Sequence, residues 1–168
     1  FAGCKALTAI DLPSGVTTIG ASAFAYCEAL TSIALPSGVT AISDSTFKGC
    51  GKLTSVTIPA RLKTVGASAF ENCKALTAID LPDSLPALGA SAFKGCEKLA
   101  SVQAACSAAI GKEAFSGCTA LTEVSLTGRK ISLESGVFSG CTSLKKLSIT
   151  GAESSVGDAA VQCCQSLI

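Results

Sequence analysis

The sequence predicts a curved α/β solenoid of about seven repeats, with a parallel β-sheet on the concave face and short helical or 3-10 turns on the convex face. The first observation behind this prediction is the spacing of phenylalanine, which recurs at intervals of 23, 23, 23, 23, 22 and 23 residues. The second is a cysteine three residues after each phenylalanine. The phenylalanines are Phe1, Phe24, Phe47, Phe70, Phe93, Phe115 and Phe138, and Val161 takes the next position.

A stretch of alternating side chains opens each repeat. In residues 7–13, Ile10 and Leu12 alternate with Ala9 and Asp11. We expect a short strand with the first pair pointing inward and the second pair pointing outward, because successive strand residues face opposite sides. The pattern returns at residues 30–36, 53–59, 76–82, 99–105, 121–126 and 144–149, and the last three copies lack the closing proline.

The remainder of each repeat is expected to turn back toward the next strand. Proline and glycine in residues 13–15 end the strand, and residues 16–19 send two more apolar side chains inward. Gly20 permits a tight bend. Residues 21–27 are then predicted to form one to two helical or 3-10 turns, with their phenylalanine and cysteine on the inner side.

The ten cysteines belong mostly to the repeat. Equivalent cysteines in stacked coils point in parallel, so their Cβ atoms do not turn toward each other as a disulfide requires. We therefore expect a ladder of buried thiols that pack as small apolar groups. The redox state of Cys106, Cys163 and Cys164 stays open. The ladder consists of Cys4, Cys27, Cys50, Cys73, Cys96, Cys118, Cys141 and Cys164.

Composition restricts the chemistry that this chain can perform. The net charge is +1, which gives no general attraction to nucleic acid or to an anionic membrane. No apolar run approaches the roughly 20 residues of a transmembrane helix. The chain has no histidine and no C-x-x-C pair, so it contains neither a Ser-His or Cys-His nucleophile pair nor a typical zinc motif. We expect no enzyme activity, no metal and no cofactor.

The ends of the sequence suggest a piece of a larger protein. The chain begins inside a repeat without methionine, and it stops where the next strand would start. Neither end has the polar character of a capping repeat. We therefore expect residues 1–168 to form a single solenoid domain that is a fragment of a longer protein.

The repeat resembles a known family. The pattern L-x-x-[IV]-x-[LI]-P followed by [VL]-x-x-[IV]-G-x-x-A-F-x-x-C is similar to the BspA-like type of leucine-rich repeat, and it covers essentially the whole chain. The one asparagine, Asn72, is not placed after a strand as in other leucine-rich repeats, which is expected of this type. The resemblance implies a surface or secreted protein of bacteria or some protists. It also implies adhesion to extracellular-matrix proteins, host cells or other microbes.

The outward strand positions are the candidate binding surface, because solenoids bind through their concave faces. We expect a non-catalytic, extracellular or cell-surface module that binds a host or matrix protein there. The alternative is a structural spacer or stalk that presents another domain, and the oligomeric state stays open. A threonine column at this surface is expected to reflect strand propensity and hydrogen bonds between neighbours. The candidate residues are Thr8, Asp11, Thr31, Ser32, Thr54, Ser55, Thr57, Thr77, Asp80, Ser101, Gln103, Thr122, Glu123, Ser125, Lys145, Lys146 and Ser148.

Overall fold

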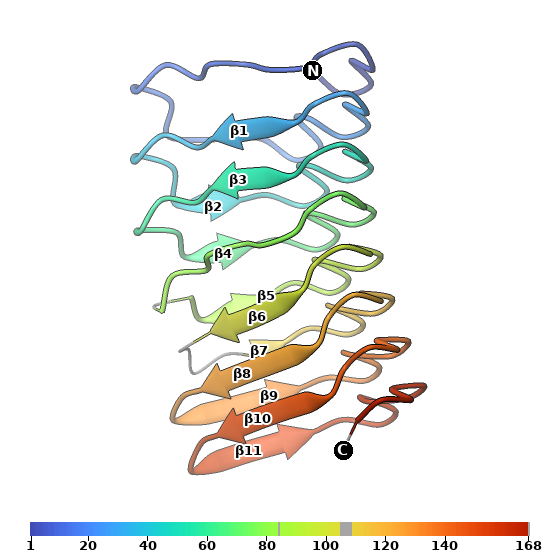
Figure 1. Ribbon diagram of the computed structural model, residues 1–168. Helices are drawn as coiled ribbons and strands as arrows, with labels where there is room; N and C mark the ends of the chain where they lie inside the picture. The colour runs from blue at the N-terminus through green and yellow to red at the C-terminus, as the bar shows by residue number, and fades with distance from the viewer. Residues whose placement is uncertain (84, 105–108, 168) are drawn as a thin grey trace.

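The computed structural model describes residues 1–83, 85–104 and 109–167. It shows a solenoid of parallel strands (Figure 1). In each full coil the chain crosses a front sheet, turns, returns across a rear sheet, and then passes through a run of tight turns to the next coil. Every strand pair is parallel, as expected for equivalent segments of successive coils.

The front sheet is built from the predicted strands. Buried and exposed side chains alternate along these strands, as expected. Ile33 and Val56 are buried between exposed neighbours, and they pair across consecutive coils. Further along, Val102 pairs with Val124 in the same way. The front strands are β1 (Ser32–Ala34), β3 (Ser55–Thr57), β6 (Ser101–Ala104), β8 (Glu123–Thr127) and β10 (Lys146–Thr150).

The rear sheet was not predicted as a sheet. Its strands are mostly very short, and each places at least one apolar side chain against the core, except in the last coil, where β11 is exposed throughout. Six strands pair in one continuous order, β2-β4-β5-β7-β9-β11. They are β2 (Ala41–Ile42), β4 (Thr64–Val65), β5 (Ala87–Leu88), β7 (Ala109–Ile110), β9 (Lys130–Leu133) and β11 (Glu153–Val156).

The predicted helical turns are wrong, because the described residues contain no helix and the fold is a β-solenoid. Two positions in each turn segment have positive φ, as at Ser22 (57°) and Tyr26 (59°). The amides of these residues and of Phe24 bond to carbonyls of the next coil, for example Phe24 N to Thr46 O at 2.9 Å and Tyr26 N to Lys48 O at 2.6 Å. A helix instead directs each amide to the carbonyl four residues back. The turn segment therefore stacks as a third ladder.

The repeat count is also lower than predicted. Six coils contribute a strand to the rear sheet, whereas residues 1–30 contain no strand, so the stack has about six repeats rather than seven. The first coil has a neighbour on one side only, and Ile10 and Leu12 are only half-buried. One backbone bond, from Thr31 N to Thr8 O at 3.1 Å, joins its predicted strand to the second coil.

The front sheet is interrupted in its middle, where a strand was predicted at residues 76–82. Ile79 and Leu81 are buried and Asp80 is exposed, as in a strand. However, residues 78–81 make no backbone hydrogen bond within the described part of the chain. Residues 7–13 have the same sequence, Leu-Thr-Ala-Ile-Asp-Leu-Pro, and also form no strand. Aspartate disfavours strands, and Asp11 and Asp80 distinguish these two copies from β1 and β3.

A column of phenylalanine rings fills the centre of the solenoid. Successive rings are nearly parallel, at 1–14°, with centroids 5.1–5.6 Å apart. Phe70 is fully buried in the middle of the column, whereas Phe1 is 63% exposed at its end. Each inner ring therefore contacts a ring above and a ring below, and the column joins the coils from Phe1 to Phe138.

Glycines at one position of the repeat, among them Gly20, Gly89 and Gly111, form a column along the stack. In its inner part, this column allows the backbones of consecutive coils to approach closely. A Cβ atom built on Gly89 would lie 2.5 Å from Ala67 N, and one built on Gly111 would lie 2.6 Å from Ala90 N. Gly20, in the first coil, has no atom within 4 Å of such a Cβ, and its φ is not positive. The column thus serves close packing of coils rather than the tight bend that the sequence suggested.

We expect Phe70→Ala to lower the free energy of unfolding by about 3–5 kcal/mol, because the cavity would lie between two coils. Phe1→Ala should cost much less, since that ring has one stacking partner. Urea unfolding followed by circular dichroism measures both changes. Equal losses at the two positions would contradict stabilisation by nearest-neighbour contacts.

We expect Gly89→Ala to destabilise the protein by about 1–3 kcal/mol or more, because the new methyl group would meet backbone atoms that cannot rotate away. Gly20→Ala is the matched control, and it should leave the midpoint of thermal unfolding nearly unchanged. A Gly89 variant as stable as the control would show that the coils can separate without cost.

Candidate functional site

The predicted surface residues follow the front of the stack. Ser125 and Ser148 are partly buried, and the other predicted residues are exposed. Thr8 and Asp11 in the first coil, and Thr77 and Asp80 in the interruption, do not lie on strands. Thr31 and Thr54 immediately precede β1 and β3. The strands at β3, β6, β8 and β10 place the remaining positions from Ser55 onward at a regular pitch, except Thr122 and Lys145, which immediately precede β8 and β10.

The threonine column is partly engaged within the sheet. Thr31 Oγ1 donates a hydrogen bond to Thr8 O at 3.2 Å, and Thr54 Oγ1 donates to Thr31 O at 2.9 Å. Thr122 Oγ1 donates to Ala100 O at 3.2 Å. These bonds confirm that the column links neighbouring coils. The hydroxyl protons are used within the protein, so a partner would meet oxygens that mainly accept hydrogen bonds.

The charges at the end of the front sheet are partly neutralised. Lys146 Nζ lies 2.8 Å from Glu123 Oε1, across the β8–β10 pair. The hydrogen bond to this carboxylate raises the pKa of Lys146. Both side chains are exposed, so the pair contributes little to stability. The charge of Lys146 is therefore engaged within the sheet, whereas Lys145 lies outside this pair.

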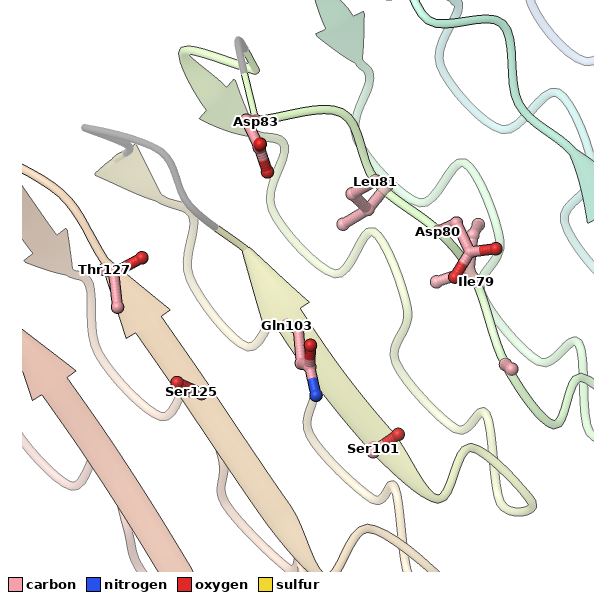
Figure 2. Close-up of a pocket in the computed structure, with 9 residues that line it drawn as sticks. Ile79, Asp80, Leu81, Asp83, Ser101, Gln103, Ser125 and Thr127 are labelled. Carbon is pink, nitrogen blue, oxygen red and sulfur yellow. The ribbon is translucent and has the colours of Figure 1, made fainter.

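Two depressions flank the interrupted segment at residues 78–81. Both lie on the front face, where that segment is separated from β3 on one side and from β6 on the other. One, of about 310 Å³, is lined by Ser55, Val56, Thr57, Ile58, Ala78, Ile79 and Asp80. The other, of about 420 Å³, is shown in Figure 2 and is lined by Ala78, Ile79, Asp80, Leu81, Asp83, Ser101, Gln103, Ser125 and Thr127.

The cysteine ladder is unbridged, as predicted, and it is buried from Cys27 to Cys141. At its ends the prediction of buried thiols is wrong, because Cys4 is exposed and Cys164 is only partly buried. Cys50 Sγ donates to Phe24 O at 3.1 Å, and the same bond to the carbonyl of the phenylalanine one coil back recurs along the ladder at 3.1–3.2 Å. The thiols are therefore hydrogen-bond donors as well as packing groups. Cys163 and Cys164 are free, and Cys106 lies outside the described residues.

Burial makes these thiols poor nucleophiles. Loss of hydration raises the pKa of Cys50 to about 12 and that of Cys141 to about 12, and it raises the pKa of Cys96 well above its ordinary value. A thiol reacts through its thiolate, so these groups are inert at neutral pH.

The described residues offer neither a metal-binding cluster nor a membrane-spanning helix. Residues 1–83, 85–104 and 109–167 contain no cluster of three or more His, Cys, Asp or Glu side chains placed to hold a metal ion. Within the same ranges, no helix has the length and apolar character needed to cross a bilayer.

Known proteins support the fold. The family model of the BspA type leucine rich repeat region matches six copies over residues 1–109 and 104–168. The crystal structure of a T. pallidum leucine-rich repeat protein superposes with a TM-score of 0.83 at 30% identity, covering 94% of this chain and 76% of that chain. The chain therefore belongs to the BspA-type leucine-rich repeat family. A search of curated proteins finds no match.

Two further structures share the fold alone. A leucine-rich repeat protein from Eubacterium ventriosum has a TM-score of 0.71 at 24% identity, covering 85% of this chain and 40% of that chain. A leucine-rich cell surface protein from Faecalibacterium prausnitzii has a TM-score of 0.53 at 23% identity, covering 87% and 48%. Proteins built from such repeats are generally interaction or repeat modules and typically lack enzymatic activity.

We expect stability to fall as pH rises from about 9 toward 12. The unfolded thiol ionises near pH 9, whereas folded Cys50 stays protonated up to about 12, so alkali favours the unfolded chain. Cys50→Ser can keep a donor to Phe24 O but removes one titrating group. When the pH is raised from about 7 to 11, the free energy of unfolding measured in urea should fall by about 1–3 kcal/mol more for the wild type than for this variant. Identical pH dependence would contradict a buried, neutral thiol at Cys50.

Proposed function

We propose that this protein is a non-catalytic adhesion module that acts outside the cell or at its surface. It binds a host or extracellular-matrix protein through the front face, which is the concave face in this proposal. The observation that carries the proposal is the regular display of exposed polar side chains on hydrogen-bonded strands. Such side chains are held in place before binding and lose little conformational entropy. The cell-surface relative from Faecalibacterium prausnitzii is consistent with the location.

The composition of the face indicates weak individual contacts. Its side chains are mainly threonine and serine, and it lacks the tryptophan, tyrosine and arginine residues that usually dominate binding energy. A repeated surface compensates by engaging several equivalent sites on an extended partner, since linked contacts raise the overall affinity. We therefore expect a fibrous or repetitive protein as the partner.

A spacer role is the second candidate, and the continuity of the stack favours it. The phenylalanine column is continuous from Phe1 to Phe138, and the rear sheet is continuous from β2 to β11, as a rod-like support requires. A spacer would not need the identity of its front side chains. Exchange of whole repeats would then leave the function of the supported domain unchanged.

The double variant Thr57→Glu with Ser125→Glu tests the binding face. We expect it to weaken binding to immobilised matrix or serum proteins about tenfold or more, because two charges would be desolvated without partners. Surface plasmon resonance against a panel of purified matrix and serum proteins measures the affinity.

The matched control adds the same charges to the rear sheet, as Thr64→Glu with Ser154→Glu, both at exposed positions. It should leave binding unchanged. If the rear variant abolishes binding while the front variant retains it, the assignment of the front face is wrong. If the unmodified protein binds no member of the panel, the spacer role is favoured.

A further inference from the structure

The junction between residues 53–75 and residues 76–98 is weakly bonded in both sheets. In the front sheet, residues 78–81 make no backbone hydrogen bond within the described part of the chain. In the rear sheet, β4 and β5 share one residue pair, Val65 with Leu88, whereas β2 and β4, and likewise β5 and β7, share two. Between the coils that follow β1, both sheets are therefore weak at the same place.

The sequence explains the weak bonding in each sheet. Lys63 N donates to Thr40 O at 2.8 Å across the preceding junction of the rear sheet. One repeat later this position is Pro86, which has no amide hydrogen to donate to Lys63 O. In the front sheet, Asp80 disfavours the strand. Each of these two residues removes support from one sheet, and both lie in the same repeat.

The turn side of the same junction is tightly bonded. Phe70 N donates to Ala92 O at 2.7 Å, and Asn72 N donates to Lys94 O at 2.8 Å. The rings of Phe70 and Phe93 lie 5.1 Å apart, which is the shortest spacing in the phenylalanine column. The two coils are therefore held firmly along the turn segments and loosely along both sheets.

We propose that this junction is a hinge at which the two parts of the stack bend relative to each other. The hinge axis follows the turn segments. The junction opens at the opposite edge, where loops connect the front strands to the rear strands (Figure 1). The depressions of about 310 and 420 Å³ leave space on both sides of residues 78–81. Hinge motions are usually absorbed by a few residues outside regular elements, as these residues are.

The hinge divides the front face into two blocks, β1–β3 and β6–β8–β10, each internally hydrogen-bonded. The angle between the blocks then sets the curvature that a partner meets. A partner that contacts both blocks selects one angle, whereas a partner of a single block leaves the angle free. Bending follows from the bonding pattern alone, so it does not depend on the adhesive role proposed above.

Distances between spin labels, measured by double electron–electron resonance, test the hinge. The labels are attached to p-acetylphenylalanine, because exposed thiols such as Cys163 would react with ordinary reagents. One pair, at Ser37 and Thr150, spans the junction at the loop edge over about 24 Å. The control pair, at Ala21 and Asp158, spans it along the turn segments, and all four positions are exposed.

The loop-edge pair should show a distance distribution about twice as wide as that of the turn-side pair, or wider, because displacement grows with distance from the hinge axis. Asp80→Thr with Pro86→Thr should narrow the loop-edge distribution to the width of the turn-side one. The first change introduces the residue that β3 has at Thr57, and the second supplies an amide hydrogen for Lys63 O.

The matched control is Asp11→Thr with Pro13→Thr. It changes the same residue types in the first coil, outside the span of the loop-edge pair, and it should leave that distribution unchanged. Wild-type distributions of equal width at the two edges would overturn the proposal without any variant. A loop-edge distribution that narrows equally in both double variants, or in neither, would overturn it as well.

Discussion

Each coil of this protein must reproduce the backbone path of the coil before it, and most other features depend on that constraint. Ring spacings of 5.1–5.6 Å in the phenylalanine column lie close to the spacing of about 4.8 Å between paired strands. The rings, the strands and the amides of the turn segments can therefore all meet their counterparts at once. The thiols add a fourth contact, since each donates to the carbonyl of the phenylalanine one coil back. A side chain or loop that changed the pitch would break all of these contacts together.

Sequence reasoning found the repeat and the front strands because both leave a simple pattern. Ile33 and Val56 alternate with exposed residues, which is the direct signature of a half-buried strand. It failed at the turn segment, where the inward residues fit a helix equally well. A usable signal was present in the column that contains Gly49, Asn72 and Gly95, because glycine and asparagine tolerate positive φ. Strands of two residues, as in β4, are too short to produce any periodicity.

The candidate surface was predictable only in part. The alternation of apolar and polar residues identified the exposed front positions, including Asp80 and Gln103, because successive residues of a strand face opposite sides. It could not identify the depression, which depends on how neighbouring coils pair rather than on the order of side chains. The aspartate that distinguishes residues 76–82 from 53–59 was a weak hint against a strand. The pairing of Lys146 with Glu123 was within reach, because one repeat period of 23 residues places them side by side in adjacent coils, but it was not predicted.

The interrupted front sheet has a mechanical consequence. Hydrogen bonds between coils run along the axis of the stack, so a pull on its two ends loads the junctions in series, one after another. Every junction carries the same force, and the one with the fewest bonds separates first. Residues 78–81 lack front-sheet bonds, and β4 and β5 behind them share a single residue pair, Val65 with Leu88. The first coil has no rear-sheet pair at all and a single front backbone bond, from Thr31 N to Thr8 O. Under tension the solenoid should therefore shed this coil first and then open at residues 78–81, where it divides into two shorter stacks.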